Sequence, residues 1–387
     1  MKRSRFPRRS KPTPNVEQLF LFSNALGQST SRLEEKYWEH RLEALIRRLL
    51  AQGDDEALNA TLDQLYQSDD RGYDHLADLI ESCCESRQEE EHDLLLVGAP
   101  ILAWSRYAIP SGKLKAETLM NLRVHLQAHV LSGDAQLALA DVLFSPDQLP
   151  ASYSETLRLL ETLGKAACKN QDLVIDPARL PEAMNFLSDT RYLLAAVAVP
   201  RGCAVFRWQE DGTSRDVSQR CWLSQGGEVL RTLFTACASE ILLPQPYHAA
   251  CREADRQSRP YAVRAAVAFL HTTLNITPTQ LRAIVAPFYE HHLEEYRIGI
   301  TQTGSHQVIH GLSWPLLEAE DETTEVVSHI ETALKEAGVT DILVLDHRFP
   351  LEWCDDCGAP LYPDPAGEPV HAEMPEGSTD TTPQHLH

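Results

Sequence analysis

Apolar residues in the N-terminal quarter of the chain recur at helical spacing. In YWEHRLEALIRRLL, residues 37–50, they fall every three or four positions and so share one helix face. Gly53 is expected to end this helix, and further amphipathic stripes follow around Leu58 and Leu76. Short helices in succession favour a small bundle or a piece of α-solenoid. We therefore predict a helical region over residues 15–110.

The pattern changes near residue 115. LRVHLQAHV, residues 122–130, alternates apolar and polar positions as a half-buried strand does, and QLALADVLF, residues 136–144, is expected to be its hairpin partner. A helix over SETLRLLETLGKAA follows. RYLLAAVAV, residues 191–199, is apolar on both faces, which predicts a central strand. CAVFRW, residues 203–208, is expected to pair with it, before a helix over 227–240.

The same order recurs near the C-terminus. EEYRIGI and HQVIHGLSW predict two strands, TEVVSHIETALKEAG a helix, and DILVLD, residues 341–346, a buried central strand. Before them, residues 259–275 are predicted as a helix and 280–290 as a strand. The helices that end the repeated units share few identical residues, so internal duplication and ordinary amphipathic spacing both remain open.

Repeated ββα units predict the α+β class: layered, with antiparallel sheet covered by helices on one side. We predict six segments along the chain. These are a basic disordered tail (1–14), the helical region (15–110), a first αβ part (111–255), a second αβ unit (256–350), a zinc-knuckle hairpin (351–375) and a disordered tail (376–387).

Composition narrows the class of protein. Apolar content of 43% and charged content of 24% are ordinary for a soluble globular protein. No apolar run approaches the roughly 18 residues of a membrane span, and no apolar core follows the basic N-terminus as in a secretory signal. The nine cysteines are thinly spread, which favours reduced thiols and a cytoplasmic protein without membrane contact. For the vicinal pair Cys83-Cys84, a packed helix end and a redox or metal role both remain open.

Charge is distributed unevenly. Residues 1–11 carry a charge of +6 and no acidic residue. Because the net charge of the whole chain is −21, the rest of the chain carries −27. An acidic body repels nucleic acid, whereas arginine forks and one aromatic ring could hold an RNA backbone or a ribonucleoprotein. A solvated basic tail is the alternative. The candidate RNA-binding residues are Lys2, Arg3, Arg5, Phe6, Arg8, Arg9 and Lys11.

The stretch CDDCGAPL, residues 354–361, resembles half of a zinc ribbon. Cys-x2-Cys followed by Gly is a knuckle that turns two thiolates toward one ion. A redox dithiol would need a helix after the first cysteine, and the prolines that follow oppose one. His371 follows Cys357 at a spacing typical of structural zinc sites, and DPAG at 364–367 predicts a turn that folds it back. His347 is the nearest candidate for a fourth ligand, although an ordinary strand-end histidine is equally consistent with its position.

Two functions from different classes fit this knuckle. The first is a cytoplasmic binding or adaptor protein with a structural zinc ion and further protein partners. The second is a zinc-dependent hydrolase, because a Cys2His set leaves an open position that could hold an activated water. Deaminase chemistry is disfavoured, since its H-x-E motif precedes its P-C-x-x-C motif and the order here is reversed. Phosphate-loop, GxSxG and HExxH motifs are absent from the sequence.

Several blocks together resemble one family. They are RSRFPRRSK, FLSDTRYLLAAVAVPRG, RAAVAFLHTTLN, EEYRIGI and WCDDCGAPLYP, and they extend from the basic tail to His371. They are similar to an uncharacterised proteobacterial family catalogued as a domain of unknown function. That resemblance implies a bacterial cytoplasmic protein and brings no catalytic residues with it.

Overall fold

The computed structural model describes residues 13–375, apart from 67–70, 106, 185, 211, 318–319, 322 and 356. The two ends of the chain, including the predicted basic arm and the predicted C-terminal tail, therefore lie outside the described residues. Among the helices of this described part, none has the length and apolar character that crossing a bilayer requires.

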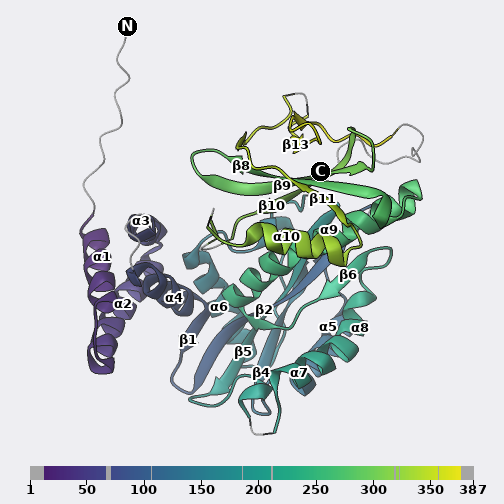
Figure 1. The fold of residues 1–387 in the computed structure, drawn as a ribbon. Coiled ribbons are helices and arrows are strands. Elements are labelled where there is room, and N and C mark those ends of the chain that lie inside the picture. The colour runs from purple at the N-terminus through teal and green to yellow at the C-terminus, as the bar shows by residue number, and fades with distance from the viewer. Residues whose placement is uncertain are drawn as a thin grey trace.

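Four helices form the N-terminal part of the structure (Figure 1). They are α1 (Pro14–Gly27), α2 (Arg32–Gln52), α3 (Asp55–Tyr66) and α4 (Arg71–Glu85). The side chains of Thr13 and Ser31 cap α1 and α2, and Gly53 ends α2 in a left-handed conformation, as predicted. Leucines from all four helices form one core. The predicted helices are confirmed, with the first beginning at Pro14 inside the predicted tail.

The helical region ends at Glu85, well before the predicted boundary at residue 110. The chain continues into β1 (Ser86–Gln88) and β2 (His92–Trp104), so the prediction of helix is wrong for this stretch. Gly98 and Pro100 make β2 hard to predict from the sequence, because both residue types are uncommon within strands. Gly98 lets α9 approach, because a Cβ there would lie 3.1 Å from the Cβ of Ala250. Pro100 lies between the stretches where β6 and β7 pair with β2.

The larger sheet has seven strands in the order β1-β2-β5-β4-β3, with β6 and β7 pairing with β2. Its remaining strands are β3 (Gly112–Lys113), β4 (Gln136–Phe144), β5 (Ser188–Pro200), β6 (Ala238–Ile241) and β7 (Gln245–Pro246). All pairs in it are antiparallel. The RYLLAAVAV segment lies in β5 between β2 and β4, so its predicted central position is confirmed.

Helices cover both faces of this sheet, not one face as predicted. One face packs against α5 (Ala116–His129), α8 (Gly227–Arg231) and the π-helical turn Trp222–Gly226, which joins α8 to the short helix α7 (Arg215–Cys221). The other face packs against α6 (Tyr153–Ala167) and the first half of α9 (Tyr247–Leu274). The strands are buried on both sides, which explains their continuous apolar runs.

Three predictions of local structure in this part are wrong. Residues 122–130 belong to α5: Leu119, Leu122 and Leu126 face the core at helical spacing, whereas Val124 is 54% exposed. CAVFRW forms no strand, and only Phe206 makes an isolated bridge, to Leu131. The predicted helix over 227–240 ends at Arg231, and its last residues form β6.

A second sheet of five strands follows along the chain. Its order is β10-β9-β8-β11, with β12 also pairing with β8. The bounds are β8 (Leu281–Tyr289), β9 (Leu293–Gln302), β10 (Val308–Pro315), β11 (Asp341–Val344) and β12 (Phe349–Pro350). The predicted β9–β10 hairpin and the helix α10 (Val326–Glu336) are confirmed, and this is the place where the predicted ββα order is found.

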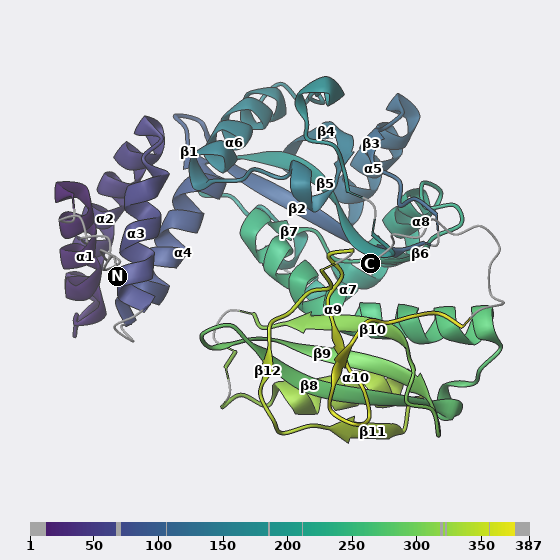
Figure 2. The same cartoon turned by 90° about the horizontal axis from the view of Figure 1, so that it is seen from above.

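DILVLD is an edge strand, so its predicted central position is wrong. β11 pairs with β8 alone, in parallel, and its side chains are half-buried. Helix α9 joins the two sheets: its first half packs on the larger one, and Val263, Val267 and Leu270 in its second half pack on the smaller one beside α10. Figure 2 shows α9 passing from one sheet to the other. The α+β class is confirmed.

Candidate metal centre

Three of the predicted ligands lie together at the C-terminal end of the described chain. One ligand atom each from Cys354, Cys357 and His371 lies within 4.8 Å of the other two. The His371 Nε2 atom is 3.2 Å from the Cys357 sulfur. The expectation that the hairpin brings His371 beside the knuckle is thus confirmed. Within the described residues, this is the one group of three or more such side chains close enough to share an ion.

The knuckle is built by backbone hydrogen bonds. The Cys354 N–H donates to the Ala359 carbonyl at 2.7 Å, and the Gly358 N–H donates to the Cys354 carbonyl at 2.8 Å. Gly358 has a φ of 71°, in the left-handed region that glycine adopts without a Cβ penalty. This turn reverses the chain directly after Cys357, so both cysteines project from one tight loop.

A two-stranded hairpin returns the chain to the knuckle. It consists of β13 (Tyr362–Pro363) and β14 (Pro369–Val370). In its turn, the Asp364 carboxylate accepts from the N–H groups of Ala366 and Glu368, both at 2.8 Å. The predicted DPAG turn is therefore present, and His371 follows β14 directly.

His347 lies outside the cluster. Its Nε2 atom is 3.2 Å from the Gly367 carbonyl oxygen in the hairpin turn, and its ring centroid is 4.0 Å from that of Phe349. A Cβ on Gly367 would lie 2.8 Å from the His347 ring. His347 thus supports the turn that positions His371, and the structure does not bring it to the two sulfurs.

Arg297 of β9 holds the knuckle segment against the smaller sheet. Its Nη1 donates to the carbonyl oxygens of Glu352, at 2.6 Å, and Leu361, at 2.8 Å, on either side of the cysteines. Its Nε donates to the Glu295 carboxylate at 2.6 Å, and its side chain is fully buried. We did not predict this role. The available signal was an arginine within the apolar strand EEYRIGI.

Two glycines make room for the hairpin on the sheet. A Cβ on Gly299 would lie 2.1 Å from the Pro363 carbonyl oxygen, and one on Gly311 would lie 2.3 Å from the Tyr362 ring. Burial in this contact raises the pKa of Tyr362 to about 12. In Figure 1 the C-terminal segment, in yellow, lies over the sheet on the side away from α10. The three candidate ligands therefore belong to a C-terminal segment that packs closely on the smaller sheet.

The ligand chemistry fits a metal ion of borderline softness. Two thiolates and one imidazole form a set that suits Zn²⁺, at about 2.3 Å from sulfur and about 2.0 Å from nitrogen. Cys357 is exposed and the other two side chains are half-buried. An ion held by these three residues would keep one coordination position for a ligand from elsewhere.

A second cysteine–histidine contact lies deep in the molecule. The Cys84 sulfur is 3.2 Å from His248 Nε2, at the junction of α4 and α9. Burial raises the pKa of the Cys84 thiol strongly and lowers the pKa of His248 to about 4, so both groups are neutral near pH 7. A reactive pair would need a thiolate. This arrangement, with Cys83 also buried, supports the packed helix end for the vicinal pair; all nine cysteines are free thiols.

The predicted RNA-binding residues cannot be placed. Lys2, Arg3, Arg5, Phe6, Arg8, Arg9 and Lys11 all lie outside the described residues. The first described residue, Thr13, caps α1, so the arm joins the molecule at the N-terminal end of that helix.

Comparisons with known proteins extend the resemblance found in the sequence. No curated protein matches the chain, and no solved structure does. A family model does match, over residues 4–385, and its description reads "Protein of unknown function (DUF2863)". Because the match covers nearly the whole chain, from the basic arm through both sheets to the residues after His371, the protein belongs to the DUF2863 family.

Proposed function

We propose that this protein is a cytoplasmic binding or adaptor protein in which one zinc ion, held by Cys354, Cys357 and His371, fixes the C-terminal hairpin. The observation that carries the proposal is the convergence of three ligand atoms within 4.8 Å on a segment already attached to the sheet. Metal binding at such a site adds directly to the stability of the fold around it. Nine free thiols suit a reducing compartment.

A structural role for the ion follows from where its ligands lie. The knuckle and His371 come from two ends of one short segment, which Arg297 and the contacts at Gly299 and Gly311 hold on the sheet. An ion that joins the two ends closes this segment into a loop. Residues beyond His371 are also attached, because the Glu373 N–H donates to the Val308 carbonyl at 2.9 Å.

Metal analysis tests the proposal. Protein purified under reducing conditions without chelator should carry about one equivalent of zinc. Cys357→Ser and His371→Ala should each lower this content several-fold, since removing a ligand weakens the site. His347→Gln is the matched control and should retain zinc, because His347 contacts the hairpin turn instead of the sulfurs. Absence of zinc from the wild-type protein would refute the proposal.

The hydrolase alternative predicts an accessible fourth position. Cobalt can replace zinc and report its ligands through its visible spectrum. If a fourth protein ligand fills the remaining position, as in a structural site, added cyanide should leave the cobalt spectrum unchanged. A new spectrum at low cyanide concentration would show an exchangeable ligand, which a catalytic site requires. That outcome would favour the hydrolase.

We also propose that the basic arm, residues 1–11, binds single-stranded RNA. The support is its charge of +6, which attracts an RNA backbone, whereas the net charge of −27 on the rest of the chain repels nucleic acid. Six neutralised phosphates imply a log–log salt slope of roughly −4 at most. Removal of residues 1–12, which leaves the Thr13 cap in place, should abolish most of this slope. Equal RNA affinities with and without the arm would exclude the arm as an RNA-binding segment.

A further inference from the structure

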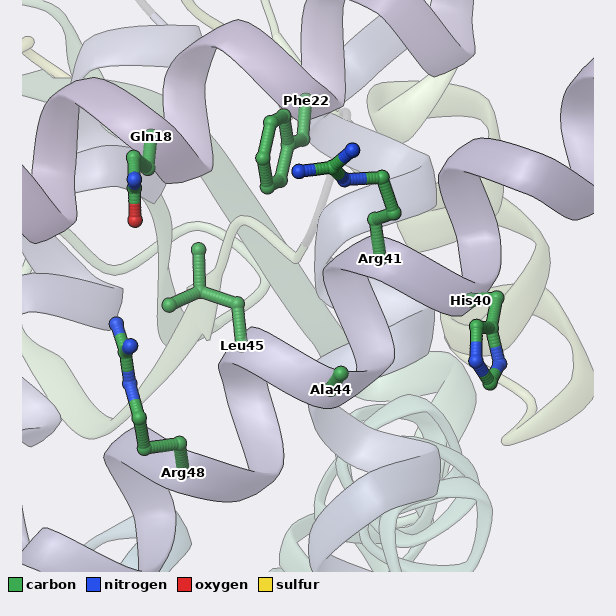
Figure 3. Close-up of a pocket in the computed structure, with 7 residues that line it drawn as sticks. All are labelled: Gln18, Phe22, His40, Arg41, Ala44, Leu45 and Arg48. Carbon is green, nitrogen blue, oxygen red and sulfur yellow. The ribbon is translucent and has the colours of Figure 1, made fainter.

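A cationic groove lies between α1 and α2, next to the point where the basic arm joins the molecule. Its volume is about 360 Å³, and Gln18 and Phe22 of α1 face His40, Arg41, Leu45 and Arg48 of α2 across it. Figure 3 shows the Arg41 and Arg48 side chains reaching from α2 toward α1. No acidic side chain is among the residues that line it.

The Arg41 guanidinium lies over an aromatic ring. Its guanidinium carbon lies 5.0 Å from the Phe22 ring centroid, and its Nη1 donates to the Tyr37 hydroxyl at 2.9 Å. Figure 3 shows the Arg41 side chain pointing toward the Phe22 ring. A guanidinium that contacts a ring through its carbon can still donate its remaining N–H groups to an oxygen ligand. Tyr37, one turn earlier on α2, is 54% exposed, and the Arg41 guanidinium carbon lies 5.7 Å from its ring centroid.

Arg48 lies at the other end of the groove. It donates to the Asn15 side-chain oxygen at 3.2 Å, which places its guanidinium beside the first turn of α1. Seven residues of helix separate Arg48 from Arg41, or about 10 Å along the axis. The two arginines therefore form a row that leads toward the attachment point of the arm.

Neither groove arginine has an acidic partner among the described residues, unlike others on the same helix. Arg32 pairs with Glu35 and Glu39, and Arg47 pairs with Glu43. The chain outside the arm carries a net charge of −27, so two neighbouring arginines that have no carboxylate partner among the described residues form an unusual cationic site. Their charges are available to an external anion.

We propose that this groove binds the backbone of a single-stranded nucleic acid, with Arg41 and Arg48 each on a phosphate and the Tyr37 ring available to a base. Guanidinium groups match phosphate oxygens in geometry, and exposed aromatic rings accept stacked bases without sequence preference. The inference rests on the proposed RNA-binding role of the arm and extends it: one strand would run from the arm along α2.

The test measures the binding of four proteins to a fluorescent oligouridine at increasing salt. They are the wild type, the protein lacking residues 1–12, R41Q/R48Q, and the control R32Q/K36Q. The control also removes two positive charges from α2, at exposed positions outside the residues that line the groove. R41Q/R48Q should bind about tenfold more weakly than the control at low salt, and its log–log slope should fall by about 1.4.

The outcomes separate this inference from the proposal about the arm. If deletion of the arm weakens binding but R41Q/R48Q matches the control, the groove is excluded and the arm retains its role. If R41Q/R48Q weakens binding and the deletion does not, the groove is confirmed and the arm is excluded. An oligoglutamate that binds the wild type as tightly as the oligouridine would overturn the assignment to nucleic acid. Circular dichroism should show equal helix content in all variants.

Discussion

The guanidinium of Arg297 donates to the carbonyl oxygen of Leu361 at 2.8 Å, and this bond joins the interior of a sheet to the segment that carries the two cysteines. The same nitrogen reaches the Glu352 carbonyl, and the guanidinium lies 4.4 Å from the Phe288 ring centroid. A buried charge with these partners couples the C-terminal segment to the body of the protein.

Arg297→Leu should destabilise the protein by about 3–5 kcal/mol. The substitution leaves two carbonyl oxygens and the Glu295 carboxylate without their buried donor. Urea unfolding measures the loss. Arg282→Gln is the control, because its pair with Asp341 is about one-third exposed and should contribute about 0–1 kcal/mol. Similar small losses for the two variants would contradict the role of Arg297.

Gly311→Ala should displace the C-terminal hairpin. The added Cβ would lie 2.3 Å from the Tyr362 ring, and overpacking of this kind costs about 1–3 kcal/mol. We expect faster proteolysis within residues 351–375 and a lower zinc content. Gly133→Ala should have neither effect, since a Cβ there meets no atom within 4 Å. Unchanged proteolysis of the Gly311 variant would show that the hairpin does not need this contact.

Removal of the metal should loosen the knuckle and leave the larger sheet intact. If an ion closes the loop as proposed, the bonds from Gly358 to Cys354 and from Cys354 to Ala359 should depend on it, whereas β5 lies between two other strands. Hydrogen exchange after chelation should therefore show lost protection at Cys354 and Gly358 and unchanged protection in β5. Equal protection with and without chelator would exclude a structural ion.

The grouping of Cys354, Cys357 and His371 could be predicted because its determinants are local. The Cys-x2-Cys-Gly turn, the DPAG turn and the spacing to His371 all lie within one short segment, and each acts through its own backbone geometry. Arg297 could not be assigned its role in the same way. Its partners are the carbonyls of Glu352 and Leu361, 55 and 64 residues away in sequence, which no local pattern indicates.

The wrong predictions in the fold have the same origin. In residues 122–130, the apolar positions fit a period of two, but Leu122 and Leu126 also fit a helix face, and packing on the sheet decides between them. The apolar run DILVLD was interpreted as central, yet β11 is an edge strand with half-buried side chains. Strand order depends on contacts between distant segments, so an apolar pattern alone does not determine it.

Glu85→Gln should change how stability depends on pH. The Glu85 carboxylate accepts a hydrogen bond from the backbone N–H of His248 at 2.8 Å, where α9 begins. The side-chain amide oxygen of glutamine can accept the same bond. Burial raises the pKa of Glu85 from 4.5 to about 7; the nearby Glu81 also raises it, while the His248 N–H and Arg252 lower it. The folded state therefore retains a proton that the unfolded state has released at these pH values.

The sign of the effect follows from that difference. The contribution of Glu85 is fully present below pH 4.5 and is lost as pH rises through about 7, because the charged carboxylate is disfavoured by burial. The variant lacks this loss, so its stability relative to the wild type should increase by on the order of 3 kcal/mol from about pH 4.5 to pH 7. Any contribution of His248 is present in both proteins. Urea unfolding at several pH values measures the difference, with Glu117→Gln, an exposed residue of α5, as the control. A relative stability that stays constant or falls as pH rises would show that Glu85 is ionised in the folded protein throughout this range.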